Sequence, residues 1–543
     1  MVQPGHVQIY SPRPIGPGTA LIDERLVPRP ARGRRLRVGL LDNNKVHVET
    51  IFRRTIEQLG PVVDADVTRR AKANASTPAN AELLALLEAR CDVVINALGD
   101  CGGCTTSSVQ DAVELERRGV PTVTFCTTVF EPLARAAARS ADMPTLPLVV
   151  LNHPIKHLDP SEVEHQVDIA FDRFLDALYS EPSIVAGSSH APAASVTGSL
   201  VEVEDSVESV SELFELWGAT DGLPVVPPTV DRVAAMLASC GLTGREQMSP
   251  LPPASVPLTT RDVAVNAVMA GCRPEYLPAV VSALRALADN RYNLRGIQAT
   301  TSAAAPLLIF SGPIVNEIGL NAGAGSLGPG RRANATIGRA VRLALINLGG
   351  ASPGSIDPST QGSPGKYTMC IAENEAESPW APLHVERGFM AGESTVTAVS
   401  ANGTLSIQES ASKATELLDT MGASVRLPGS HDYFFGGYPT FLLCPEHASL
   451  LAAAGYSKSD VKKELLSRSE MSLTEFSEHN LHFVTRFRLD ETRPGGESVT
   501  SVTVAREPDN IMIVVVGGAG THSTFVTSNG YAVPVTRVVA LGD

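Results

Sequence analysis

The chain lacks any long hydrophobic run. Hydrophobic residues make up 43% of its 543 positions, but no apolar stretch reaches the about 18 residues that mark a membrane-spanning helix. The first residues, MVQPGHVQIYSP, also lack the charged-then-apolar pattern of a secretory signal. We therefore expect these hydrophobic residues to form the cores of two or more soluble domains.

Cysteine and basic residues are also scarce. Eight cysteines in 543 residues are too few for a disulfide scaffold, so we expect a cytoplasmic protein in a reducing compartment. The chain has 44 Lys and Arg against 58 Asp and Glu, a formal net charge of −14. Because such a surface repels phosphate backbones, nucleic acid is not expected as a partner, and the lack of a long apolar stretch speaks against a membrane. A small-molecule substrate is expected instead, and homo-oligomer formation stays open.

Two of the cysteines stand together in a CGGC turn, Cys101 and Cys104. The turn follows an apolar run at 91–98 and precedes a helical pattern at 107–118. Backbone N–H groups at a helix start carry partial positive charge, which favours a thiolate there. Two thiols at this spacing can also close into a disulfide, so that one attacks and the other resolves. The turn is the first candidate for a reactive site.

Two plainer interpretations of the turn remain. A CxxC can be half of a zinc site, which usually needs a second ligand pair. The other cysteines form no second CxxC, although histidines can complete such a site. The pair can also be inert core cysteines. The glycines between the thiols and the hydroxyls after them instead favour a loop whose backbone groups are used, and we predict no metal. The sequence identifies no cofactor.

The first part of the chain alternates strands and helices. Strands are expected at 36–41, 62–67, 92–98, 120–125 and 146–151, with helical patterns between them and a closing helix at 161–179. This alternation predicts parallel βαβ units with right-handed crossovers, and we expect a flavodoxin-like doubly wound sheet at 36–180. Residues 181–199, rich in Ser, Ala, Pro and Gly, are expected to be a linker.

Polar residues follow four of these expected strands. In doubly wound sheets ligands bind beyond the carboxyl ends of the strands, so these residues are expected to meet at one edge of the sheet. They are Asp42, Asn43 and Asn44 after the first strand, Asp100, Cys101, Cys104, Thr105 and Thr106 after the third, Cys126, Thr127 and Thr128 after the fourth, and His153 and His157 after the fifth.

A second unit of α/β or α+β type is expected at 200–543. It offers a Cys444–His447 pair after an apolar run, and a glycine-rich loop at 517–523 that resembles an anion-binding nest. His522 in that loop is a candidate acid–base or substrate-binding group. Lys366, Tyr367, Glu373, Asn374 and Glu375 are further polar candidates that the sequence does not rank, and the sequence gives this unit no function.

The stretch at 99–134, which begins GDCGGCTTSS and includes FCTTVFEPLA, resembles the UGSC family of selenoproteins and their cysteine homologues. The likeness covers about residues 37–180. Cys101 stands where that family has selenocysteine, Gly103 where it has serine, and Cys104 at its final cysteine. The resemblance implies that Cys101 is the attacking thiol and Cys104 the resolving thiol or a second ligand. Gly103 removes one hydroxyl from the family pattern.

Three functions are compatible with this sequence. The first is a thiol-dependent enzyme that reduces or reductively cleaves a small polar, anionic or carbonyl-containing substrate, with a thiol reductant as partner. The second is an isomerase, racemase or lyase using Cys101 and Cys126 from two sides, similar to two-cysteine racemases. The third is a metal-binding protein without thiol catalysis. In the first, Thr105 and Thr106 bind an oxyanion, His153 or His157 moves protons, and Asn43 and Asn44 orient the substrate.

Overall fold

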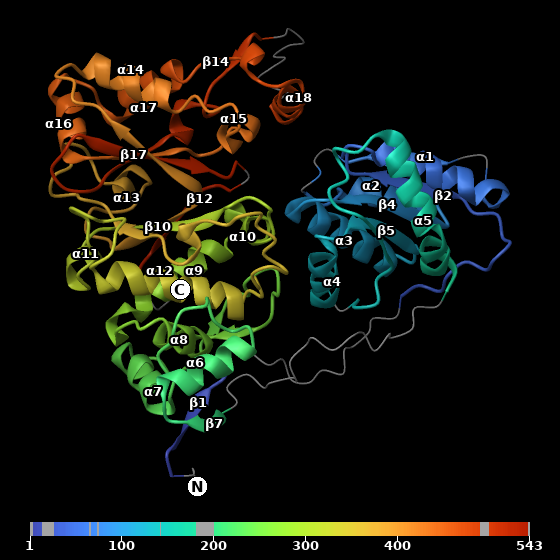
Figure 1. Cartoon of the computed structure of the whole chain (residues 1–543), viewed down its shortest axis with the longest axis horizontal. Coiled ribbons are helices and arrows are strands. Elements are labelled where there is room, and N and C mark those ends of the chain that lie inside the picture. The colour runs from blue at the N-terminus through green and yellow to red at the C-terminus, as the bar shows by residue number, and fades with distance from the viewer. Residues whose placement is uncertain are drawn as a thin grey trace.

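The computed structural model describes residues 4–13, 26–64, 67–72, 75, 77–141, 143–180, 200–488, 499–530 and 532–540. The expected linker at 181–199 lies outside these described residues. Figure 1 shows two bodies side by side, a smaller one formed by the described residues between 26 and 180 and a larger one formed by residues from 200 onward together with the first strand of the chain. No helix in these ranges is long and apolar enough to cross a membrane.

The smaller body is built on a parallel sheet. Among its described residues, five strands pair in the order β3-β2-β4-β5-β6, and every pairing is parallel. In chain order this is 2-1-3-4-5, the flavodoxin-like arrangement, so the predicted fold class is confirmed. The strands are β2 (Val38–Asp42), β3 (Thr68–Ala71), β4 (Val93–Gly99), β5 (Thr122–Thr127) and β6 (Leu148–Leu151).

Helices cover both faces of this sheet. Helices α1 and α5 pack together over one face around Phe52 and Phe174, both buried. Helices α2, α3 and α4 cover the other face, where alanines and valines of α3 and α4 meet. Their bounds are α1 (Val48–Leu59), α2 (Ala81–Arg90), α3 (Gly102–Arg117), α4 (Glu131–Ser140) and α5 (Pro160–Tyr179).

Two local predictions differ from the structure. The second strand, expected at 62–67, is assigned later as β3, whose sequence is Thr-Arg-Arg-Ala; within the expected segment Val63 forms a parallel bridge with Leu36, and residues 65 and 66 lie outside the described residues. As an edge strand β3 is mostly exposed, so its residues carry no apolar pattern to reveal it. Helix α3 begins at Gly102 rather than at 107. The CGGC turn therefore forms the first turn of the helix, and both thiols lie at its N-terminus.

The larger body has a mixed, curled sheet. Its described strands run β11-β10-β12-β17-β13-β16, with β18 also pairing with β12. The pairs β10–β11 and β13–β16 are parallel and the others antiparallel. The bounds are β10 (Ala305–Ser311), β11 (Cys370–Ala372), β12 (Thr395–Gln408), β13 (Thr440–Leu443), β16 (Met512–Val515), β17 (His522–Ser528) and β18 (Val535–Val538).

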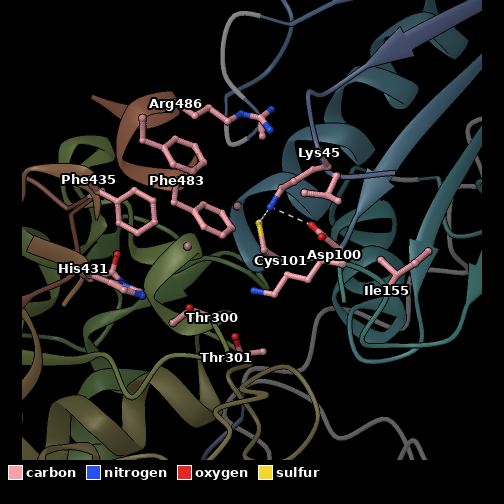
Figure 2. A pocket seen from close by; sticks show the side chains of 18 of the residues that line it. Lys45, Asp100, Cys101, Ile155, Thr300, Thr301, His431, Phe435, Phe483 and Arg486 are labelled. Carbon is pink, nitrogen blue, oxygen red and sulfur yellow. Dashed lines mark hydrogen bonds and ion pairs between the residues drawn. The ribbon is translucent and has the colours of Figure 1, made fainter. Parts of the chain in front are cut away.

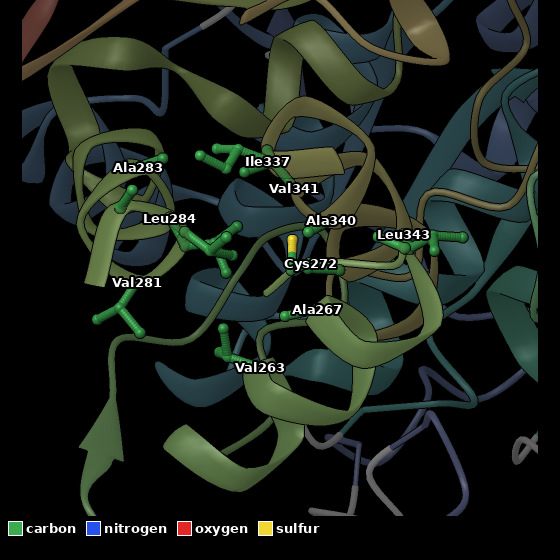
Figure 3. Packing of buried hydrophobic residues seen from close by; sticks show 14 of the residues in the cluster. Val263, Ala267, Cys272, Val281, Ala283, Leu284, Ile337, Ala340, Val341 and Leu343 are labelled. Carbon is green, nitrogen blue, oxygen red and sulfur yellow. The ribbon is translucent and has the colours of Figure 1, made fainter. Parts of the chain in front are cut away.

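Three hydrophobic clusters pack against this sheet: two lie under helices, and the third joins strand residues such as Ile309, Leu442 and Val514. In Figure 3, buried residues of α8, α9 and α12, such as Val263, Leu284 and Val341, interlock beneath one face. A second core lies under α14, α16 and α17. These helices are α8 (Thr260–Met269), α9 (Leu277–Ala288), α12 (Arg332–Asn347), α14 (Ala414–Ser424), α16 (Pro445–Ala453) and α17 (Lys458–Arg468).

Shorter elements complete the larger body. Small strand pairs join β8 (Gln247–Met248) to β9 (Leu258–Thr259) and β14 (Met471–Ser472) to β15 (Ser501–Val502). The remaining helices are α6 (Val207–Leu216), α7 (Val230–Ser239), α10 (Leu294–Gln298), α11 (Ile314–Glu317), α13 (Leu383–Glu386), α15 (His431–Phe435) and α18 (Glu478–Phe487).

The beginning of the chain packs on the larger body, not on the parallel sheet. Strand β1 (His6–Tyr10) pairs antiparallel with β7 (Leu200–Glu204), and Tyr10 is the partner of Leu200. Ile9 is fully buried in the core that also contains α8 and α9. The larger body is thus formed by two segments of the chain, one that precedes the thiol-bearing body in the sequence and one that follows it.

Candidate active site

The N-terminus of α3 holds both thiols of the CGGC turn. Cys101 is the N-cap residue, and its Sγ accepts a hydrogen bond from the Cys104 N–H at 3.4 Å. The Cys104 Sγ in turn accepts from the Cys101 N–H at 3.0 Å. Both cysteines are free, and their sulfur atoms lie 2.7 Å apart. The helix start therefore offers its N–H groups to sulfur, as it would to an anion.

Lys45 adds a full positive charge to this arrangement. It lies in the loop after β2, and its Nζ is 3.3 Å from Cys101 Sγ and 3.0 Å from an oxygen of Asp100 (Figure 2). The loop turns sharply at Asn44, which has φ of 60°. Burial lowers the pKa of Lys45, but the charges of Asp100 and Cys101 raise it further and hold it well above its ordinary value. The ammonium therefore stays charged beside the sulfur.

The two thiols are driven to opposite protonation states. The hydrogen bond from the Cys104 thiol, supported by the Lys45 charge and opposed by burial, lowers the pKa of Cys101 to about 6. Burial raises the pKa of Cys104 well above its ordinary value. Near neutral pH, Cys101 is then a thiolate and Cys104 a thiol that donates to it. This is the division of labour that an attacking and a resolving thiol require.

A cavity of about 230 Å³ opens onto Cys101 between the two bodies. Figure 2 shows side chains from both bodies converging on it. From the thiol-bearing body it is lined by Lys45, Val46, Ala75, Asp100, Cys101, Gly102, Gly103, His153, Ile155 and Lys156. From the larger body it is lined by Asn293, Gly296, Thr300, Thr301, His431, Phe435, His482, Phe483, Arg486, Phe487 and Asn529.

The wall from the larger body is aromatic and basic. Phe483 and Arg486 come from α18 and Phe435 from α15, and Lys156 of the opposite wall places its Nζ 5.6 Å from the centre of the Phe483 ring. Asp100 is the only carboxylate among the described lining residues. Burial lowers the pKa of His431 to about 4, so this imidazole is neutral near pH 7. The cavity suits a ligand with an anionic group and an apolar or aromatic part.

The two bodies touch directly beside the thiols. Phe130 and Leu133 of the thiol-bearing body pack with Ala299 and Ile356 of the larger one. Gly102 approaches the Ala299 carbonyl so closely that a Cβ on it would lie 2.4 Å from the oxygen. A glycine is needed here because backbone atoms of two domains meet. The contact fixes α3 against the segment that carries Thr300 and Thr301.

Several predicted residues do line the cavity or its continuation. Asp100, Cys101 and His153 face it, and Asp42 and Asn44 line an adjoining hollow of about 630 Å³ that shares Lys45 and Arg486 with it. Burial lowers the pKa of His153, which favours a neutral imidazole, and its Nδ1 lies 3.1 Å from the Thr127 hydroxyl.

Other predicted residues hold the fold instead. Asn43 is fully buried and bridges the Leu98 backbone N–H and carbonyl at 2.8 and 2.7 Å. Thr105 and Thr106 are buried in α3, and the Thr106 hydroxyl donates to the Gly102 carbonyl. Neither threonine lines the cavity on Cys101, so the predicted oxyanion role of these hydroxyls lacks support.

Four predicted residues lie away from the cavity. Cys126 is 1% exposed among alanines and valines of α3 and α4, and burial raises its pKa to about 12. His157 is exposed and contacts the His479 ring, and Thr128 lines a different hollow. His522 begins β17, whereas the cavity is lined by Asn529, beyond the other end of that strand. The carboxyl ends of parallel strands meet at one edge of the sheet, which we call the strand-end rule. Successive side chains along a strand, however, point to opposite faces of the sheet, so not every residue near this edge reaches the cavity.

Sequence reasoning missed Lys45 and the whole wall of the larger body. Lys45 follows the predicted Asn43 and Asn44 directly, but nothing local shows that its side chain turns toward the third strand. Phe483 and Arg486 belong to an amphipathic helix whose pattern is that of any surface helix. Their role depends on how the two bodies dock, which no short-range pattern encodes.

The thiols also lie within reach of a shared metal ion. Ligand atoms of Asp100, Cys101 and Cys104 are all within 4.8 Å of one another. The Lys45 ammonium, however, already occupies the space beside Asp100 and Cys101. A metal cation would be repelled by this charge, so these residues fit an ammonium–thiolate pair better than a metal centre.

One family of known proteins matches the part of the chain that contains the thiol turn. Residues 8–180 match the model of the UGSC family. No curated protein and no solved structure matches the chain. The matched region contains the CGGC turn, Lys45 and the entire parallel sheet. The resemblance of the N-terminal part of this chain to the UGSC family is therefore confirmed, over residues 8–180.

Proposed function

We propose that the chain is a thiol-dependent oxidoreductase that reduces a small anionic substrate in the cavity between its two bodies. The observation that carries this proposal is the pair of sulfur atoms 2.7 Å apart, one with its pKa lowered to about 6 and the other with its pKa raised. An isomerase that uses Cys126 as the second thiol is less well supported, because that side chain is buried outside the cavity.

The proposed reaction transfers two electrons from the dithiol. The Cys101 thiolate attacks the electrophilic atom X of a reducible X–Y bond, forming an S–X bond while Y leaves with the bonding pair and takes a proton. Cys104 then loses its proton and attacks Cys101 Sγ, forming the disulfide. X leaves with the S–X electron pair and that proton. A small dithiol or protein dithiol reductant restores both thiols, which suits a reducing compartment such as the cytoplasm.

Lys45 serves this cycle in two ways. Its charge stabilises the thiolate before the attack. When Cys101 becomes covalently bound, one of the negative charges that raise the Lys45 pKa disappears while Asp100 remains, so the Lys45 pKa falls. The ammonium then becomes a better acid at the moment when Y needs a proton. His153, neutral in the same cavity, is the second proton carrier within reach.

Both bodies contribute to substrate recognition in this proposal. Arg486 of the larger body and Lys156 of the thiol-bearing body attract the anionic group, while Phe435 and Phe483 of the larger body cover the apolar part. The close contact between Gly102 and the Ala299 carbonyl holds the wall from the larger body in a fixed position relative to the Cys101 thiolate.

A matched pair of disulfide probes tests the proposal. The reduced full-length protein is mixed with 5,5′-dithiobis(2-nitrobenzoate), which is anionic and aromatic, and separately with the uncharged 4,4′-dithiodipyridine. We expect two leaving thiols per protein from this pair, a Cys101–Cys104 disulfide in the peptide mass map, and a faster reaction for the anionic probe. Arg486→Met should remove the preference for the anion while the uncharged probe reacts at its former rate.

Two results would contradict the proposal. A first modification at another cysteine would remove Cys101 from the role of attacking thiol. A stable mixed disulfide on Cys101 that Cys104 never displaces would remove the redox cycle. Cys101→Ser is the matched control, since it keeps the size of the side chain and should abolish both products.

A further inference from the structure

A second cluster of ligand-type side chains lies in the larger body, apart from the thiols. Glu373 and Glu375 follow β11, and His384 comes from the short helix α13. One ligand atom from each of the three lies within 4.8 Å of the other two. None of the three lines the cavity at Cys101, so the cluster is independent of the proposed thiol chemistry.

His384 carries an unsatisfied nitrogen into this cluster. Its side chain is fully buried, and its Nε2 lies 3.3 Å from the Ala391 carbonyl. A carbonyl accepts only, so Nε2 must hold the proton of the neutral ring. Nδ1 then presents a lone pair 3.7 Å from a Glu375 oxygen and has no hydrogen-bond partner among the described residues. Two facing acceptors need a cation or a proton between them.

The carboxylates are positioned rather than neutralised by their surroundings. Glu373 is 1% exposed, and its oxygens accept from the Leu383 N–H at 2.8 and 3.0 Å and from the Ser311 hydroxyl at 2.8 Å. Glu375 accepts from the Gly312 N–H at 2.6 Å. These neutral donors fix the direction of both carboxylates but leave their charges in place.

The lysine whose charge acts on Glu373 has other partners. Lys458 exerts an attractive charge on Glu373, yet its Nζ is bound to Glu386 at 3.0 Å and to the Ala381 carbonyl at 3.1 Å. Burial, the larger influence, still raises the pKa of Glu373. A divalent cation at the centre of the cluster would remove this cost and also satisfy Nδ1.

We propose that Glu373, Glu375 and His384 bind one divalent first-row transition-metal ion of the Zn²⁺ class. One imidazole and two carboxylates form a mixed nitrogen and oxygen donor set, which suits zinc-like ions better than calcium or magnesium. The contact of Nε2 with a backbone carbonyl is the support that metal-binding histidines usually have. Three protein ligands leave a coordination position for water or a ligand on the side of Glu375, whose side chain is 30% exposed.

Zinc titration of the full-length protein tests this site. The protein is stripped with a chelator, dialysed and titrated with Zn²⁺, and bound metal is measured by elemental analysis. A variant with both Cys101→Ser and Cys104→Ser removes the other metal-capable cluster. We expect one equivalent of zinc in the wild type and in this double variant. Glu375→Gln should weaken zinc binding by at least about tenfold, as the loss of a direct ligand requires.

A neighbouring carboxylate gives the matched control. Glu377 lies two residues on and contacts the Asn374 side chain, so Glu377→Gln changes the same loop without removing a ligand and should bind zinc like the wild type. Co²⁺ replaces Zn²⁺ as an optical probe and should show no thiolate charge-transfer band. Absence of binding in the double cysteine variant, or unchanged binding in Glu375→Gln, would overturn the proposal.

Discussion

Replacing Lys45 with methionine removes the ammonium that lies 3.3 Å from Cys101 Sγ while keeping a side chain of similar length. An opposite charge at this range lowers a pKa by about 1–3 units. We therefore expect the Cys101 pKa, about 6 in the wild type, to rise to about 7.5 in Lys45→Met. The alkylation rate of Cys101 as a function of pH reports this value directly, because only the thiolate reacts.

The expected rates follow from two opposing effects. At pH 6 the thiolate fraction falls about 16-fold in Lys45→Met, while the more basic thiolate gains about four- to sixfold in nucleophilicity, with a Brønsted coefficient of about 0.4–0.5. The variant should therefore react about three- to fourfold more slowly at pH 6. At pH 9 Cys101 is ionised in both the wild type and the variant, so its more basic thiolate should make the variant react about four- to fivefold faster. The two rate profiles must cross.

This crossing distinguishes the effect of the Lys45 charge on the Cys101 pKa from an effect on the access of the reagent to the cavity. A mutation that merely opened or blocked the cavity would shift the rate in one direction at every pH. The assay is limited alkylation with iodoacetamide from about pH 5 to 9, followed by mass spectrometry of the peptide that contains Cys101. Lys156→Met is the matched control, because this lysine also lines the cavity but lies over the Phe483 ring. A wild-type midpoint near the ordinary thiol value of 9.0 would refute the reasoning, as would parallel profiles.

Three further substitutions test the arrangement around the thiols. Cys104→Ser should leave a stable mixed disulfide on Cys101 after reaction with the anionic probe, detected by intact mass, and rapid release would contradict a resolving role. Cys126→Ala should cost about 1 kcal/mol in thermal stability and leave the Cys101 rate profile unchanged; loss of reactivity would revive the two-cysteine interpretation. Gly102→Ala pushes a methyl group against the Ala299 carbonyl, so it should destabilise the protein by about 1–3 kcal/mol and speed alkylation of Cys101; wild-type stability would show that the bodies are not held together there.

The parallel sheet was predictable from sequence because its signals are local. Buried strands such as β4 and β5 are continuous apolar runs, and each is followed by a helical pattern. The same rule placed Asp100, Cys101 and His153 near one edge, since the carboxyl ends of parallel strands meet there.

The remaining parts of the site were not predictable in this way. Cys126 satisfies the strand-end rule but points to the helix side, and a one-residue change of position reverses which face a side chain takes. Lys45 requires knowledge of how its loop bends. Phe483 and Arg486 lie more than three hundred residues after the thiols in sequence, and only the docking of the two bodies brings them to Cys101.

The pairing of β1 with β7 has a consequence for how the chain is assembled. Tyr10 and Leu200 are partners in one ladder, so the polypeptide departs toward the thiol-bearing body and returns from it at neighbouring points. The thiol-bearing body is therefore a domain inserted into the larger one. We expect that a short hairpin joining residue 10 to residue 200 would remove the inserted domain and leave the core of the larger body, including Ile9, in place.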